Sequence, residues 1–145
     1  MLYRLVENTQ LTKTVWRMKL AGDTSAIKAP GQFVQLTVPG FYLRRPISIC
    51  NWDEETITLV YKVVGQGTEA MSAMKIGMEL DVLNGLGNGF DTSRCGDKPL
   101  LIGGGVGLPP MIGLCKQLLA EGKHPTVLAG FNTAEEVFLK DAVDA

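Results

Sequence analysis

The chain has 145 residues, of which 46% are hydrophobic and 20% are charged, and its formal net charge is −1. This composition supports a packed core and argues against disorder. The balanced charge argues against a general nucleic-acid binder, which needs a basic surface to neutralise phosphates. No apolar run approaches the roughly 18 residues that a membrane span needs, so we expect a cytoplasmic protein that contacts no membrane.

The cysteines and the histidine restrict the chemistry of the chain. Cys50, Cys95 and Cys115 are far apart and form no C-x-x-C pair. Such a set is typical of reduced thiols rather than of a disulfide framework or a metal site. His124 is the only histidine, which excludes zinc sites built on two histidines. We interpret it as a polar connection residue and therefore expect no Ser-His-Asp triad. Chemistry must therefore come from a bound cofactor.

The first part of the chain has the pattern of a small β-barrel. Six short segments alternate in polarity or are rich in β-branched and aromatic residues, with turn residues between them. They are Leu2–Glu7, Thr14–Leu20, Gln32–Val38, Arg45–Cys50, Thr56–Val64 and Glu79–Leu83. Six short strands within about eighty residues predict a closed, antiparallel barrel.

A short helix interrupts these strands. Thr68 is expected to cap a helix over Glu69–Met74 that ends at Gly77. Glycines before a capped helix form a potential anion site. The alternative is a crossover helix that plugs one end of the barrel with its methionines. The later glycine-rich loop Asn84–Phe90 either brings backbone close to a ligand or only turns a corner.

A strand, a glycine turn and a helix follow the barrel. After the predicted strand Leu100–Ile102 come four glycines within five positions, Gly103, Gly104, Gly105 and Gly107. They allow a tight turn close to a bound anion, although the spacing does not fit G-x-G-x-x-G and the alternative is a turn that binds nothing. A helix over Pro110–Glu121 and a strand over Thr126–Phe131 complete a parallel βαβ unit.

This unit is too small to stand as a complete nucleotide-binding domain. Two parallel strands and one helix cannot bury both faces of a sheet. We therefore expect residues 1–95 to form the barrel domain and residues 96–145 to form the N-terminal part of an incomplete α/β domain. Either the chain is truncated, which we favour, or a partner completes the sheet.

Five short sequence motifs occur in an order that is typical of one protein family. They are Pro30–Phe33, Leu43–Ile49, Val60–Thr68, Gly87–Phe90 and Gly103–Gly107. A barrel followed by a βαβ unit with these motifs resembles the ferredoxin-reductase-like flavoproteins. Within them the chain is most similar to the electron-transfer subunits of class B, NAD-dependent dihydroorotate dehydrogenases. Ile47, where many broader relatives have an aromatic residue, favours this group.

The resemblance implies an FAD site. It places Arg45 on the diphosphate, where a guanidinium can pair with two phosphate oxygens. The alternative for Arg44 and for Arg45 is a solvated strand end, and we expect this of one of the two. Pro46 would stiffen the segment, and Ser48, with the backbone of Ile47, would bind the edge of the isoalloxazine ring. The remaining residues that it implies around FAD are Val60, Tyr61, Lys62, Gly67 and Thr68. It places NAD(H) over Gly103, Gly104, Gly105 and Gly107.

The resemblance also implies a function. In the family, electrons from dihydroorotate oxidation in pyrimidine biosynthesis leave an FMN-containing catalytic subunit. They pass through a [2Fe–2S] cluster and FAD to NAD+, within a heterotetramer. The clustered cysteines that hold the iron are missing here, so we expect no metal, no catalytic side chain and no activity of this chain alone. The alternatives are a subunit of another NAD(P)H-linked ferredoxin or sulfide oxidoreductase, and a non-catalytic assembly module.

Overall fold

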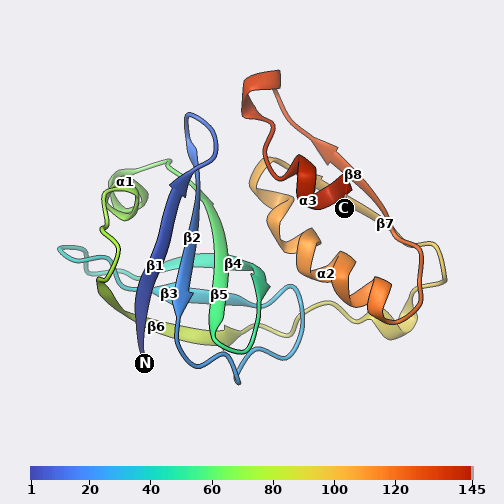
Figure 1. The fold of residues 1–145 in the computed structure, drawn as a ribbon, viewed down its shortest axis with the longest axis horizontal. Helices are drawn as coiled ribbons and strands as arrows, with labels where there is room; N and C mark the ends of the chain where they lie inside the picture. The colour runs from blue at the N-terminus through green and yellow to red at the C-terminus, as the bar shows by residue number, and fades with distance from the viewer. Residues whose placement is uncertain (145) are drawn as a thin grey trace.

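The computed structural model describes residues 1–144, and its larger part is a β-barrel (Figure 1). Six strands close into this barrel in the order β1-β2-β5-β4-β3-β6, with every neighbouring pair antiparallel. The elements are β1 (Leu2–Gln10), β2 (Val15–Ala21), β3 (Phe33–Leu36), β4 (Arg45–Trp52), β5 (Thr56–Lys62), α1 (Gln66–Ser72) and β6 (Glu79–Leu86). The predicted six-stranded antiparallel barrel is confirmed.

The alternation of residues along the strands builds the barrel core. Side chains that point inward from all six strands are almost fully buried, because every second residue of a strand faces the same side. They include Leu5, Met18, Val34, Ile49, Leu59 and Val82. The ladder between β2 and β5 runs without a shift from Val15↔Lys62 to Ala21↔Thr56. This wall of the barrel is therefore regular along its whole length.

Helix α1 closes one end of the barrel. Met71 and Met74 of this segment belong to the barrel core, as the alternative of a plugging helix supposed. The predicted N-cap at Thr68 is wrong, because the N-cap is Gly65 and Thr68 lies in the first turn. The Thr68 hydroxyl instead accepts hydrogen bonds from the backbone N–H groups of Val64 (2.9 Å) and Gly65 (3.2 Å). It thereby fixes the turn that enters the helix.

The second unit is a two-stranded parallel sheet with one helix. It consists of β7 (Leu100–Gly104), α2 (Pro109–Ala120) and β8 (Thr126–Gly130), and the strands pair in parallel. This confirms the predicted βαβ unit. Helix α2 covers one face of the sheet. On the opposite face three apolar side chains are more than half exposed, namely Leu100, Ile102 and Leu128.

The end of the described chain folds back against the barrel. The sequence did not predict the short helix α3 (Lys140–Asp144) or the turn before it. Phe138, which is 6% exposed, packs with Val60 of the barrel and Ile112 of α2. This segment and α2 therefore join the two units. Within residues 1–144 no helix is long and apolar enough to span a membrane.

Shortening a core side chain should destabilise the barrel far more than the same change on the bare sheet face. Leu59 is fully buried, whereas Leu128 is 57% exposed. We expect Leu59→Ala to lower the free energy of unfolding by about 2–5 kcal/mol, because a buried cavity remains. Leu128→Ala should lower it by less than about 1 kcal/mol. Urea unfolding of both variants measures this, and equal losses would contradict the described core.

Candidate functional site

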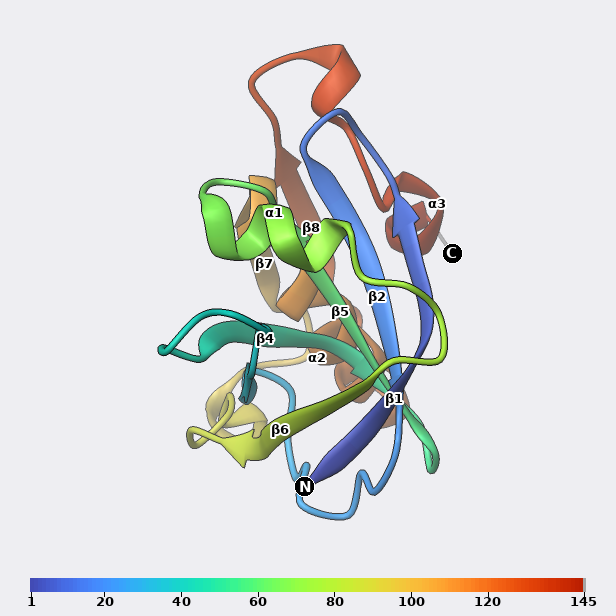
Figure 2. The same cartoon turned by 90° about the vertical axis from the view of Figure 1, so that its left-hand side faces the viewer.

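The candidate site lies where β4 and β5 separate. The ladder between these strands runs only from Ile49↔Leu59 to Trp52↔Ile57. Arg45–Ser48 on β4 and Val60–Lys62 on β5, the two segments predicted to bind flavin, lie outside this ladder. Figure 2 shows the strands diverging beneath α1. Backbone N–H and C=O groups that lose a neighbouring strand need other partners, so this opening in the barrel wall is suited to a ligand.

Side chains of β4 divide between the two sides of the strand. Pro46 and Ser48 are exposed on the outer side. Ile47 is half-buried and packs against the barrel core. A ligand at this strand can therefore reach the Ser48 hydroxyl more readily than the Ile47 side chain.

The predicted residues of β5 are placed differently from one another. Tyr61 is 2% exposed and points into the barrel, where its hydroxyl donates to Asn8 Oδ1 at 3.0 Å and burial raises its pKa. Val60 is buried against Phe138. Only Lys62 presents its side chain to solvent. At Val60 and Tyr61 a ligand can meet backbone alone.

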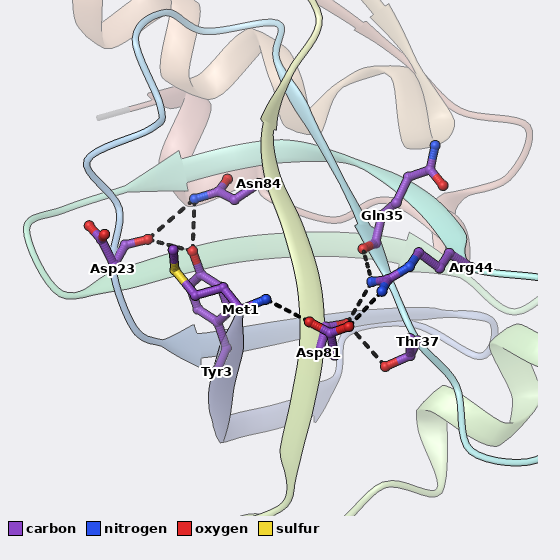
Figure 3. Close-up of polar contacts among 8 residues, drawn as sticks. All are labelled: Met1, Tyr3, Asp23, Gln35, Thr37, Arg44, Asp81 and Asn84. Atoms are coloured by element: carbon purple, nitrogen blue, oxygen red, sulfur yellow. Dashed lines mark hydrogen bonds and ion pairs between the residues drawn. The ribbon is translucent and has the colours of Figure 1, made fainter.

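Arg44 makes an ion pair and hydrogen bonds that stabilise the fold. Its Nη2 lies 2.5 Å from Asp81 Oδ2, and its Nη1 donates to the backbone oxygens of Asp81 (3.1 Å) and Gln35 (3.4 Å). The N-terminal ammonium of Met1 lies 2.6 Å from the other carboxylate oxygen, Asp81 Oδ1. Figure 3 shows these contacts, in which Asp81 links β1, β6 and the start of β4. These two cations lower the pKa of the Asp81 carboxyl.

Arg45, unlike Arg44, has no carboxylate within ion-pair distance among residues 1–144. Its guanidinium lies 5.1 Å from the centre of the Phe41 ring and donates to the backbone oxygen of Leu43. A Cβ atom on Gly67 would fall 2.2 Å from Arg45 Nε. The fold thus brings Arg45 against Gly67, two of the predicted site residues that are distant in sequence.

The four glycines after β7 have two different roles. Gly103 is buried, and a Cβ atom there would lie 2.7 Å from the Cα atom of Leu108, so Gly103 allows close packing. Gly104, Gly105 and Gly107 have open space around them, and Gly105 has a φ of +53°. A cavity of about 520 Å³ lies between Gly104, Gly105, Lys62 and the end of β8. Ligands of open α/β sheets bind at this carboxyl edge.

The sequence did not predict the role of several polar residues whose hydrogen bonds fix the segments around the candidate site. Asn8 links Tyr61 to α1, because its Nδ2 donates to the Met71 backbone oxygen at 2.9 Å. Asn84 donates to the Tyr3 hydroxyl at 3.0 Å (Figure 3). Gln32 fixes the glycine-rich loop, since its Nε2 donates to the backbone oxygens of Gly85 and Gly87, both at 3.0 Å. Gln32 lies within the Pro30–Phe33 motif, which is a signal that could have identified it.

The cysteines stand apart in the structure. All three are free, and burial raises the pKa of the Cys50 thiol to about 11. Within residues 1–144 no three His, Cys, Asp or Glu side chains gather into a group that could hold a metal ion.

The ion pairs of Asp81 should make stability depend on pH. A carboxyl whose pKa is lowered in the folded state stabilises the fold above its unfolded pKa, near 3.9, and loses that contribution as the pH falls through its folded pKa. We expect Asp81→Asn to be less stable than wild type at neutral pH, with the difference shrinking below about pH 4. The control is Asp97→Asn at an exposed residue outside the ion pairs. A pH-independent difference in urea unfolding contradicts the account.

Comparison with known proteins gives related sequences but no family model that matches the chain. The chain is 39% identical over 143 residues to the dihydroorotate dehydrogenase B (NAD(+)) electron transfer subunit of Fusobacterium nucleatum, covering 93% of this chain and 55% of the relative. It is 36% identical over 148 residues to the subunit of that name from Listeria monocytogenes, covering 98% and 58%. The chain thus spans somewhat more than half the length of these curated relatives.

A solved structure shares the fold. The NADH-dependent reduced ferredoxin-NADP oxidoreductase superposes with a TM-score of 0.88 and 27% sequence identity, over 97% of this chain and 52% of the other. The chain is therefore a homologue of the electron transfer subunits of dihydroorotate dehydrogenase B, over nearly its whole length, and has the barrel of the ferredoxin reductase fold.

Proposed function

We propose that the chain is part of a flavoprotein electron-transfer subunit that binds FAD through residues 1–95. In the complete protein it passes electrons from dihydroorotate oxidation to NAD+, within pyrimidine biosynthesis. The homology to dihydroorotate dehydrogenase B subunits supports this assignment. The single structural observation that carries it is the guanidinium of Arg45, which pairs with no carboxylate and lies beside Gly67, next to the strands that separate.

The neighbouring residues fit a flavin dinucleotide. Arg45 can donate two parallel hydrogen bonds to diphosphate oxygens, and the absence of a side chain at Gly67 leaves room for the guanidinium. Thr68 holds the turn before α1, whose backbone N–H groups can add to this anion site. FAD supplies the electron and hydride transfer when it is bound, and the protein supplies binding and orientation.

The remaining predicted residues position the reactive ring and the nucleotide. Ser48 and the backbone of Ile47 would bind the polar edge of the isoalloxazine, while Pro46 limits the motion of this segment. Lys62 and the backbone of Val60 and Tyr61 form the other side of the opening. Gly104, Gly105 and Gly107, with Gly103 behind them, would take NAD(H) in the cavity at the carboxyl edge of the sheet. The cysteine thiols of residues 1–144 lie apart from one another and form no site for an iron–sulfur cluster.

The partner would be the FMN-containing catalytic subunit, since the relatives are named as the electron transfer subunit of a larger enzyme. A second candidate is a subunit of another NAD(P)H-linked ferredoxin oxidoreductase, which the similarity to ferredoxin-NADP oxidoreductase favours. Both candidates require bound flavin, whereas an assembly module requires none.

Replacing Arg45 should weaken FAD binding selectively. Charged hydrogen bonds contribute about 1.5–3 kcal/mol each, so we expect Arg45→Ala to raise the Kd for FAD by at least about tenfold. Arg44→Ala should lower stability but change the Kd much less, because Arg44 binds Asp81. Fluorescence titration of the folded variants with FAD measures both constants. Equal effects of the two substitutions on the Kd would contradict this choice of arginine.

A glycine variant tests the same site without removing a charge. In Gly67→Ala the new methyl group must displace the Arg45 guanidinium, so FAD affinity should fall although alanine favours a helix. The control is Gly96→Ala, where nothing lies within 4 Å of the added Cβ. Unchanged affinity of Gly67→Ala would show that the position of Arg45 does not matter to the flavin.

A further inference from the structure

A second cavity lies between the barrel and the two helices α2 and α3, which are on the same side of the barrel (Figure 1). Its volume is about 500 Å³, which is within the range of small-molecule sites. It shares no lining residue with the cavity at the carboxyl edge of the β7–β8 sheet. None of its lining residues belongs to Arg45–Ser48 or Val60–Lys62 at the opening of the barrel wall. This cavity is therefore separate from both parts of the candidate site.

The packing of α2 on β4 explains why the space stays open. A Cβ atom on Gly113 would lie 3.0 Å from the Cys50 backbone oxygen, so the helix approaches the strand closely at this point. An irregularity in the pairing of β4 with β5 leaves Cys50 as an extra residue, buried on the side of α2. Beyond this contact the short side chains of Thr58 and Ala142 line the space without filling it.

The wall formed by the helices is apolar. It includes Ile112 and Leu119 of α2, together with Leu139 and Val143 around α3. Among residues 1–144, Leu139 is the one residue other than glycine with a positive φ, +59°. A leucine persists in this conformation only where the surrounding packing fixes it, and its side chain packs against the cluster around Phe138. A hydrocarbon group placed against this wall would be removed from water, which is favourable.

The opposite wall and the rim of the cavity are basic. Arg17 and Lys19 of β2 and Lys116 of α2 line it, whereas no Asp or Glu of residues 1–144 does. Arg17 is already paired with Glu7, at 2.9 Å. Lys19 and Lys116 have no carboxylate within ion-pair distance in the described chain. Burial raises the pKa of the Cys50 thiol, and the charges of Lys116 and Arg17 oppose this rise, so these charges act within the cavity.

We propose that this cavity binds a medium-chain fatty acid, with the carboxylate on Lys116 and Lys19 and the hydrocarbon chain against α2 and α3. The unpaired cations select an anion, and the apolar wall selects a hydrocarbon body. Asn51 and Thr58 also line the cavity and can donate hydrogen bonds to the carboxylate. Such a ligand contacts the barrel and both helices at once, so its binding stabilises their association.

The test compares two amphiphiles of the same chain length and opposite charge. Decanoate and decyltrimethylammonium are titrated into the chain by calorimetry, and circular dichroism checks each fold. We expect decanoate to bind at one site and the cation to bind at least about tenfold more weakly. Lys116→Gln should weaken decanoate about fivefold or more, because it removes a charged hydrogen bond. The matched control is Lys98→Gln, at an exposed lysine outside the cavity, which should leave the affinity unchanged.

The thiols locate the bound decanoate. Cys115 lines the cavity, whereas Cys95 does not. Decanoate should therefore slow the alkylation of Cys115 by iodoacetamide, followed by peptide mass spectrometry, and leave the rate at Cys95 unchanged. Equal binding of the two amphiphiles, an unchanged affinity in Lys116→Gln, or an unprotected Cys115 overturns the proposal. A folded chain that binds no decanoate overturns it as well, whereas titration of the same sample with FAD tests the proposed function independently.

Discussion

The candidate site depends on one constraint, the early end of the ladder between β4 and β5. Strand β4 stays paired with β3 from Arg45 to Ser48, and β5 stays paired with β2 as far as Lys62. The barrel is therefore held closed on both sides while these two strands separate beyond Ile49 and Leu59. Backbone groups at the opening, and the arginine at its edge, become available to a ligand without loss of the core.

Two adjacent arginines differ in their contacts, since Arg44 pairs with Asp81 whereas Arg45 pairs with no carboxylate among residues 1–144. The pairing of Arg44 with Asp81 crosses 37 residues of sequence, so no local pattern reveals which arginine is committed. The strands were predictable because alternation is local, and the parallel pair because its helix has regular apolar spacing. Tyr61 shows the limit. It faces the barrel core like Ile57 and Leu59 of the same strand, as alternation predicts, but its hydroxyl donates to Asn8 on β1, a partner that no local pattern reveals.

Glycines and helix ends show the same limit. Gly103 is needed for packing against Leu108, whereas Gly104 and Gly105 border the cavity, and the sequence alone cannot separate these roles. Thr68 was expected to cap a helix that begins one turn earlier. The segment around Phe138 has no strong periodicity, and it is ordered by the apolar seam between Val60 and Ile112. Tertiary packing therefore decides these features.

The visible absorption spectrum of the purified chain, with chromatographic identification of the released chromophore, tests the central claim most directly. A barrel that holds FAD through Arg45 predicts a yellow protein whose chromophore is FAD, at a ratio near one per chain. A colourless protein that is folded by circular dichroism and takes up no added FAD would contradict the account. In that case the free arginine and the separated strands would serve another purpose, such as assembly.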